Sequence, residues 1–194
     1  MIGKQTGLLA GAILAAFGLA SLANGAPALE PGFILKSSTF EDGGLVPMRI
    51  AFKANAEFPD CFGENVSPAL SWENPRPGTK SFAVTMFEIE DPPHYDLVAY
   101  GIPANVTSFA EGEFSKPSAK YVGGSNFRKM ATWRGMCPPR NIGTSVHHYQ
   151  FTVFGTDLDP KELPPGLSGD ELMEKLKGHM KGKAVLIAAF KRPS

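Results

Sequence analysis

A small set of side chains in this sequence could do chemistry, and it falls into two groups far apart along the chain. Carboxylates and an imidazole flank a pair of prolines in the first group, and a proline, an imidazole and a phenol form the second: Glu88, Glu90, His94, Asp96, Pro138, His147 and Tyr149. Convergent imidazole and phenol groups can hydrogen-bond an anionic or polar ligand, whereas a nearby carboxylate repels an anion unless it is protonated.

Metal binding and acid–base catalysis are alternative uses of the same residue types. Glu90 and Asp96, with His94 or His147, would suit Zn²⁺ or Mn²⁺ if they converge, although no His-Glu-x-x-His pattern supports this. Two acids could equally serve a glycosidase, for which their separation decides the mechanism. The ordinary alternative is that the acids are solvated turn residues and that His147 is satisfied by a backbone carbonyl.

The elements that position these groups are expected to be strands. The run 81–87 is apolar on both of its faces, which indicates a strand covered on both sides. The run 97–102 ends at Pro103, which cannot donate to a central ladder. Residues 27–72 are broken by Pro and Gly, so short strands in long loops are expected there. Residues 104–136 show little periodicity and are interpreted as a long excursion that shapes the rim of a site.

A further strand is predicted over 149–154, where the residues alternate in polarity. Because side chains alternate between the faces of a strand, His147 shares a face with Tyr149, and His148 points the other way. The two neighbouring histidines therefore belong to different environments.

One helix is expected near the C-terminus. Ser168 and Glu171 have the spacing of a capping box, and apolar residues recur at helical spacing from Leu172 to Met180. The run 184–190 is then interpreted as a last buried strand. Many strands, one helix and no βαβ alternation predict a mainly β protein, an antiparallel β-sandwich with a C-terminal helix and long loops.

The first 25 residues differ in composition from the rest. Lys4 precedes an apolar run over 8–22, and small residues follow it, so we expect a signal peptide over 1–25 and a single domain over 26–194. The mature protein is then periplasmic or secreted. The apolar run is shorter than the roughly 20 residues of a membrane-spanning helix, and no cysteine near the cleavage point could carry a lipid. We therefore expect no stable membrane anchor after cleavage.

The charge balance excludes a global basic surface. The chain has 19 Lys and Arg and 19 Asp and Glu residues, and removing the leader takes away Lys4 alone, which leaves a formal charge of −1. Nucleic acid is therefore not an expected partner, and any affinity for anions must be local. The two cysteines, Cys61 and Cys137, form a possible disulfide in an exported chain, provided that their Cα atoms lie within bonding range.

Several separated motifs, in order, resemble the phosphatidylethanolamine-binding protein family, in its bacterial Raf-kinase-inhibitor-like branch of the YbhB/YbcL type. The most specific is Asn65-x-Ser67-Pro68-x-Leu70-x-Trp72. It is followed by Pro77-x-Thr79-x-Ser81-Phe82-Ala83, Tyr100-x-Ile102-Pro103, Cys137-Pro138-Pro139, His147-x-Tyr149 and Gly178-His179. The resemblance covers roughly residues 58–190. It implies a small Greek-key β-sandwich with an anion pocket, and it does not imply an enzyme. Many cytoplasmic members carry cysteines at the same two positions, so the resemblance does not decide whether Cys61 and Cys137 form a disulfide.

The expected pocket departs from the family's pattern at several positions. The resemblance places an acidic Asp-Pro-Asp-x-Pro turn where this chain has Glu88-Ile89-Glu90-Asp91-Pro92, and a histidine where it has Asp96. His94 lies two residues before Asp96 and points the same way in an extended strand, so it could replace the missing imidazole. A carboxylate-rich pocket with few cations disfavours a dianion, so the fold is better supported than phosphate binding.

These observations lead to one main hypothesis and two rivals. The main one is an exported binding protein without cofactor or catalytic residues, whose rim pocket takes a small anionic or polar ligand or the tip of a partner protein. His147 and Tyr149 would provide hydrogen bonds, Pro138 shape, and the glutamates acidic selection. The first rival is a regulator of an extracytoplasmic enzyme that uses the excursion around 111–134 as a contact surface. The second is a metal-assisted hydrolase.

Overall fold

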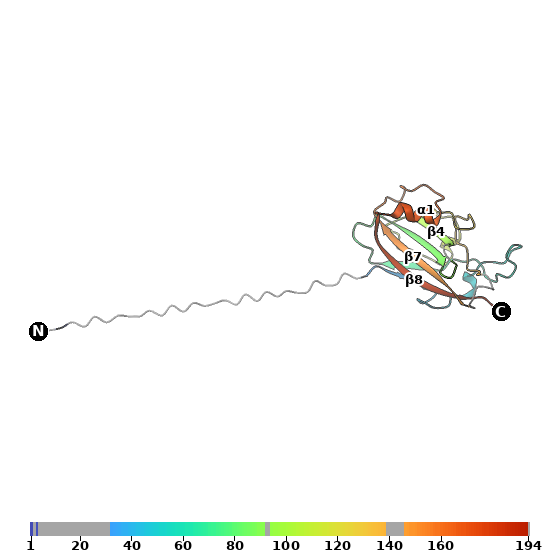
Figure 1. The fold of residues 1–194 in the computed structure, drawn as a ribbon, viewed down its shortest axis with the longest axis horizontal. Coiled ribbons are helices and arrows are strands. Elements are labelled where there is room, and N and C mark those ends of the chain that lie inside the picture. The colour runs from blue at the N-terminus through green and yellow to red at the C-terminus, as the bar shows by residue number, and fades with distance from the viewer. Residues whose placement is uncertain (2, 4–31, 92–93, 139–145, 194) are drawn as a thin grey trace. The chain divides into compact units, whose positions relative to one another are not determined.

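Two antiparallel sheets form the molecule, which was obtained as a computed structural model (Figure 1). The structure describes residues 1, 3, 32–91, 94–138 and 146–193. The predicted signal peptide and Pro139 lie outside the described residues. The larger sheet has the order β6-β4-β3-β7-β8, and the smaller one has the order β1-β2-β5. The predicted antiparallel sandwich with one helix and long loops is confirmed.

The strands of the larger sheet include the four predicted apolar runs. Its strands are β3 (Ser81–Glu88), β4 (Tyr95–Pro103), β6 (Val122–Gly123), β7 (Val146–Thr156) and β8 (Met180–Lys191). The smaller sheet contains β1 (Ile34–Lys36), β2 (Leu70–Glu73) and β5 (Ser108–Phe109). Two short 3-10 turns, η1 (Met48–Ile50) and η2 (Glu113–Ser115), lie in the connections.

Both faces of β3, in the middle of the larger sheet, are buried, as its apolar run predicts. One face packs against the smaller sheet, where the ring of Trp72 lies 5.2 Å from that of Phe82 in an edge-on arrangement. The other face carries Ala83 of β3 with Val98 and Tyr100 of β4, and it packs against Leu172 and Leu176 of α1 (Gly169–Leu176) (Figure 1). Burial on both faces excludes water from the middle of β3 and β7 and makes them a rigid support for what lies at their ends.

The helix begins as predicted and ends earlier. Ser168 accepts a hydrogen bond from the backbone N–H of Glu171, and the Glu171 carboxylate accepts one from the backbone N–H of Ser168, so the capping box is complete. Gly178 has φ +80°, a left-handed conformation that glycine adopts without steric cost, and it stops the helix. The placement of Met180 on the helix was therefore wrong, because this residue opens β8. No helix in the described part of the chain is long and apolar enough to cross a membrane.

Candidate functional site

A cavity of about 350 Å³ opens where β3 ends and β4 begins. Its described wall combines three arginines, three carboxylates, an imidazole, two aromatic rings and one half of a cystine: Arg128, Arg134, Arg192, Glu88, Asp91, Asp96, His94, Phe58, Phe127 and Cys137. The carboxylates and the imidazole come from the ends of β3 and β4 and the turn between them. The arginines come from the excursion before β7 and from the chain after β8, and Phe58 comes from the chain before β2. Four distant segments therefore build the site.

Glu88 is the deepest acid of the turn and is held by two side chains of β7. The register places Glu88 opposite Tyr149. The Nδ1 atom of His147 lies 2.6 Å from Glu88 Oε1, and the Tyr149 hydroxyl donates to Glu88 Oε2 at 2.9 Å. All three side chains are buried, and burial together with Glu88 raises the pKa of Tyr149 well above its ordinary value. His147 and Tyr149 therefore orient Glu88 from behind.

Asp96 on β4 is paired with a buried arginine. Arg134 Nη1 lies 3.2 Å from Asp96 Oδ1, and the two residues are 5% and 3% exposed. Burial raises the pKa of Asp96 to about 7, although the charge and hydrogen bond of Arg134 lower it in part. The removal of the carboxylate from water thus outweighs its cationic partner, and the carboxyl exists in both protonation states near neutral pH.

Arg134 itself sits in an aromatic cage. Its guanidinium carbon lies 4.8 to 5.2 Å from the ring centres of Phe52, Phe58 and Phe127. Cation–π contacts of this kind favour a desolvated guanidinium. Its Nε–H is nevertheless buried without a hydrogen-bond partner. A buried donor without an acceptor costs free energy, so Arg134 is held here at the expense of one hydrogen bond.

The other two arginines close the sides of the cavity. Arg192 donates to the carbonyl oxygens of Pro138 and Asp60 at 2.8 and 3.0 Å, and its Nε–H is also buried without a partner. Arg128 pairs with Glu57 at 2.9 Å and covers the ring of Phe58 at 4.6 Å. Two of the three arginines that line the cavity therefore have a buried Nε–H group without a hydrogen-bond partner.

His94 stands at the half-exposed mouth of the cavity. Its Nδ1 atom lies 3.2 Å from Asp91 Oδ2, and its ring lies 5.2 Å from that of Phe127. His94 and Asp96 both line the cavity, which agrees with the prediction that they point the same way. The acids of the turn thus have protein partners of their own, His94 for Asp91 and His147 with Tyr149 for Glu88.

Glu90 turns toward His148 instead of the cavity wall. Its Oε2 accepts from the backbone N–H of His148 at 2.8 Å, and its Oε1 lies 2.6 Å from the ring Nδ1. Partial burial raises the pKa of Glu90, but these contacts with His148 outweigh it and leave the pKa below its ordinary value. The parity prediction holds here, because His147 serves Glu88 and His148 serves Glu90 on opposite sides of β7.

A potential group of metal ligands overlaps these pairs. Atoms of Glu88, Glu90 and His147 lie within 4.8 Å of one another, a different set from the one expected with Asp96 and His94. Both oxygens of each glutamate already accept hydrogen bonds from β7. A cation would therefore have to displace protein donors before it could bind.

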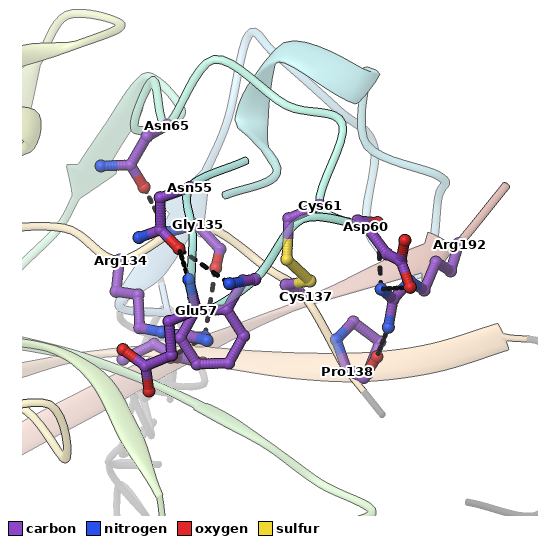
Figure 2. The surroundings of a disulfide bond; sticks show 12 residues. Asn55, Glu57, Asp60, Cys61, Asn65, Arg134, Gly135, Cys137, Pro138 and Arg192 are labelled. Atoms are coloured by element: carbon purple, nitrogen blue, oxygen red, sulfur yellow. Dashed lines mark hydrogen bonds and ion pairs between the residues drawn. A yellow bond between two sulfur atoms is a disulfide. The ribbon is translucent and has the colours of Figure 1, made fainter. Parts of the chain in front are cut away.

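Cys61 and Cys137 form a disulfide with a Cα–Cα distance of 5.8 Å. It joins the segment 53–62, which we call the Phe58 loop, to the wall that carries Cys137 (Figure 2). In Figure 2 the cystine lies between Arg134 with Gly135 on one side and Arg192 with Pro138 on the other. Pro138 was expected to shape the pocket. In the structure it is not one of the residues that line the cavity, and its carbonyl oxygen accepts a hydrogen bond from Arg192, which does line it.

Sequence reasoning anticipated the acids and missed the cations. Glu88, His94 and Asp96 line the cavity as proposed, whereas the three arginines and Phe58 were not among the candidates. The one available signal was the excursion, which was expected to form a rim and does supply Arg128 and Arg134. The excursion is less suited to the rival hypothesis of a contact surface for a partner protein, because several of its side chains are in the hydrophobic core: Phe109, Phe114, Tyr121 and Trp133.

Comparisons with known proteins agree with this fold. A family model described as phosphatidylethanolamine-binding protein matches residues 36–191. A UPF0098 protein of Methanothermobacter thermautotrophicus is 31% identical over 162 residues, which cover 81% of this chain and 98% of that protein. The putative lipoprotein LppC of Mycobacterium tuberculosis is 29% identical over 85% of this chain and 75% of its own length. The crystal structure of Escherichia coli YbcL, described as a new member of the mammalian PEBP family, has a TM-score of 0.71 at 27% identity and covers 82% of this chain and 98% of YbcL.

Proposed function

Since this chain belongs to the phosphatidylethanolamine-binding protein family, in its bacterial YbhB/YbcL branch, we propose that it is a binding protein whose arginine-lined cavity takes a small anionic group. The observation that carries the proposal is the convergence of three arginines, Arg128, Arg134 and Arg192, on the wall of a cavity of about 350 Å³. An anionic oxygen is the acceptor that satisfies a guanidinium donor best.

The balance of charge in the wall supports an anion. Glu88 already receives hydrogen bonds from β7, and Asp91 lies beside His94. Asp96 is partly protonated near neutral pH because burial raises its pKa to about 7. Three arginines face these carboxyls, so the acids do not dominate the field as the sequence alone suggested. The binding energy comes from guanidinium donors in a site of low dielectric.

The test is a calorimetric titration of the full chain with inorganic phosphate and with phosphoethanolamine. We expect saturable binding that weakens at least tenfold in Arg134→Gln and in Arg192→Gln, because each substitution removes a charged donor. Arg49→Gln is the matched control, since Arg49 pairs with Glu111 on the surface away from the cavity. Binding that is absent, or equally weak in all three variants, would refute the anion site.

We also propose that the protein works outside the cytoplasm. The composition of residues 1–25 supports a cleaved leader, and the description of the mycobacterial relative as a putative lipoprotein supports the same location. Expression of the full chain in a bacterium with an outer membrane, followed by fractionation and intact-mass measurement, tests this. We expect a shortened product in the extracytoplasmic fraction, and a full-length product in the cytoplasm would contradict it.

Binding, not turnover, is the activity proposed. Ser67, the serine of the most specific motif, is fully buried, and its hydroxyl accepts from the backbone N–H of Phe114. It therefore serves the fold and is not presented as a nucleophile. The metal-assisted hydrolase is disfavoured by the occupied oxygens of Glu88 and Glu90, and an unchanged thermal transition with added Zn²⁺ or Mn²⁺ would remove it.

A further inference from the structure

The Phe58 loop forms one wall of the cavity but is weakly anchored by packing. Most of its side chains between residues 53 and 62 are exposed, Phe58 is half-buried, and Cys61 is buried. An antiparallel bridge between Lys53 and Phe62 closes its base, and Asn55 organises its turn by accepting from the N–H groups of Glu57 and Phe58. Segments with little buried apolar surface open locally at low cost, so the covalent link matters for holding this loop in place.

The contacts of the loop with the rest of the described chain include an exposed ion pair, aromatic and cation–π contacts of Phe58, and a hydrogen bond from Arg192. Glu57 forms an ion pair with Arg128 in which both side chains are well exposed. The ring of Phe58 lies under the guanidinium groups of Arg128 and Arg134, and Arg192 donates to the carbonyl of Asp60. Exposed ion pairs contribute little to stability, and the cation–π contacts require the loop to be in place first.

The disulfide is not part of either cluster of core residues, although Cys61 is itself buried. Neither cysteine is in a strand. The contacts of β3, β4, β7 and β8 with one another do not pass through the cystine. Breaking the bond would therefore free the loop and leave the sheets assembled.

The cystine can be reached from the cavity. Cys137 is half-buried and lines the cavity, whereas Cys61 is 2% exposed. An attacking thiolate that enters the cavity therefore meets Cys137 before Cys61, in a wall that contains three arginines and three carboxyl groups. The arginines attract the thiolate, which is the reactive form of a thiol.

We propose that Cys61–Cys137 is a redox latch on the cavity. A dithiol reductant supplies the two electrons: its first thiolate attacks the Cys137 sulfur, the S–S bond breaks, and Cys61 leaves as a thiolate that takes up a proton. The second thiol of the reductant then displaces Cys137 as a thiol and leaves as an intramolecular disulfide. Reduction releases the Phe58 loop, removes the ring that holds Arg128 and Arg134, and lowers the affinity for anions while the fold persists. The affinity part of this inference rests on the proposed function, and the loop release does not.

The experiment compares hydrogen exchange in the full chain as the disulfide form, after complete reduction with dithiothreitol, and as the double variant Cys61→Ser with Cys137→Ser. We expect the amides of residues 53–62 to exchange at least tenfold faster in the reduced protein and in the variant. The amides of β3 and β7 should keep their protection, and reoxidation should restore the loop. The same samples are titrated with inorganic phosphate, for which we expect at least a tenfold weaker affinity without the disulfide.

Two results would overturn the latch. One is unchanged exchange of the loop after mass spectrometry has verified complete reduction. The other is a joint loss of protection in the loop and in β3 and β7, which would make the disulfide a staple of the whole fold. If the oxidised protein binds no phosphate, the proposed anion site fails, and the loop exchange still decides the latch. Phe58→Ala with an intact disulfide is the matched variant, since it should weaken phosphate binding without releasing the loop.

Discussion

A single buried carboxyl, Asp96, sets the pH response expected of the cavity. Its pKa is raised to about 7, so it is neutral below that pH and carries a negative charge above it. An anion binds better beside the neutral form, and the affinity should therefore rise as the pH falls through 7. Removing one like charge at contact distance is worth at least about 1 kcal/mol even with screening, which corresponds to roughly 5- to 10-fold.

Sulfate is the suitable probe because it stays a dianion over this range. We expect calorimetry to show sulfate binding roughly 5- to 10-fold tighter at pH 5.5 than at pH 8.5. Asp96→Asn should bind tightly at both values, because Asn imitates the neutral carboxyl. The cavity also contains His94 beside Asp91, so a pH effect that survives in Asp96→Asn and disappears in His94→Gln would assign the response to the imidazole.

A second prediction at this scale concerns the buried hydroxyl behind the cavity. Tyr149→Phe removes the donor to Glu88 Oε2 and leaves a buried carboxylate oxygen without it. The free energy of unfolding should fall by about 1–3 kcal/mol, the usual cost of a buried polar group that loses its partner. Denaturation by urea measures the change. Tyr95→Phe is the control, since Tyr95 is only half-buried and should change the free energy by less than about 0.5 kcal/mol.

At the scale of elements, the register of β3 against β7 decides which residues meet. The pairing of Glu88 with Tyr149 brings His147 to Glu88, and His148 meets Glu90 beyond the end of β3. A shift of the register by one residue would exchange the faces of His147 and His148. The two Glu–His pairs are therefore consequences of one strand alignment.

The helix provides a prediction at the same scale. Ser168→Ala removes the hydroxyl that accepts from the N–H of Glu171 and donates to Glu171 Oε2, and it leaves only the backbone half of the capping box. We expect a loss of about 1 kcal/mol in the free energy of unfolding, measured by urea denaturation. Ser168→Asp should retain most of the stability, because a carboxylate also caps a helix. Equal losses in both variants would show that the cap is not the cause.

At the scale of the whole molecule, the disulfide constrains the unfolded chain. Cys61 and Cys137 are 76 residues apart, and in the chain-entropy description a loop of this size corresponds to about 4 kcal/mol. The double serine variant should therefore unfold at a temperature lower by on the order of 10 °C, and still cooperatively, because the sheets keep their cores. Calorimetry measures both properties. A transition that loses its cooperativity would mean that the cystine is needed for the fold itself.

The sequence alone determined the elements whose residues signal their own environment. The runs 81–87, 97–102 and 149–154 predicted strands because burial on one or both faces leaves a periodic pattern, and the spacing of Ser168 and Glu171 predicted the start of α1. The end of the helix was placed too late, because the apolar spacing continues through Met180 although Gly178 has already turned the chain.

Only the tertiary structure decided what the cavity contains. Arg134 and Arg192 are 58 positions apart, and neither has a local pattern that distinguishes it from a solvated surface arginine. They converge because the excursion and the chain after β8 both return to the open ends of β3 and β4. The acids of the turn lie close together in sequence and could be predicted as a group, and the cations that face them could not. Contacts between distant segments depend on register and loop path, which leave no signature in the residues themselves.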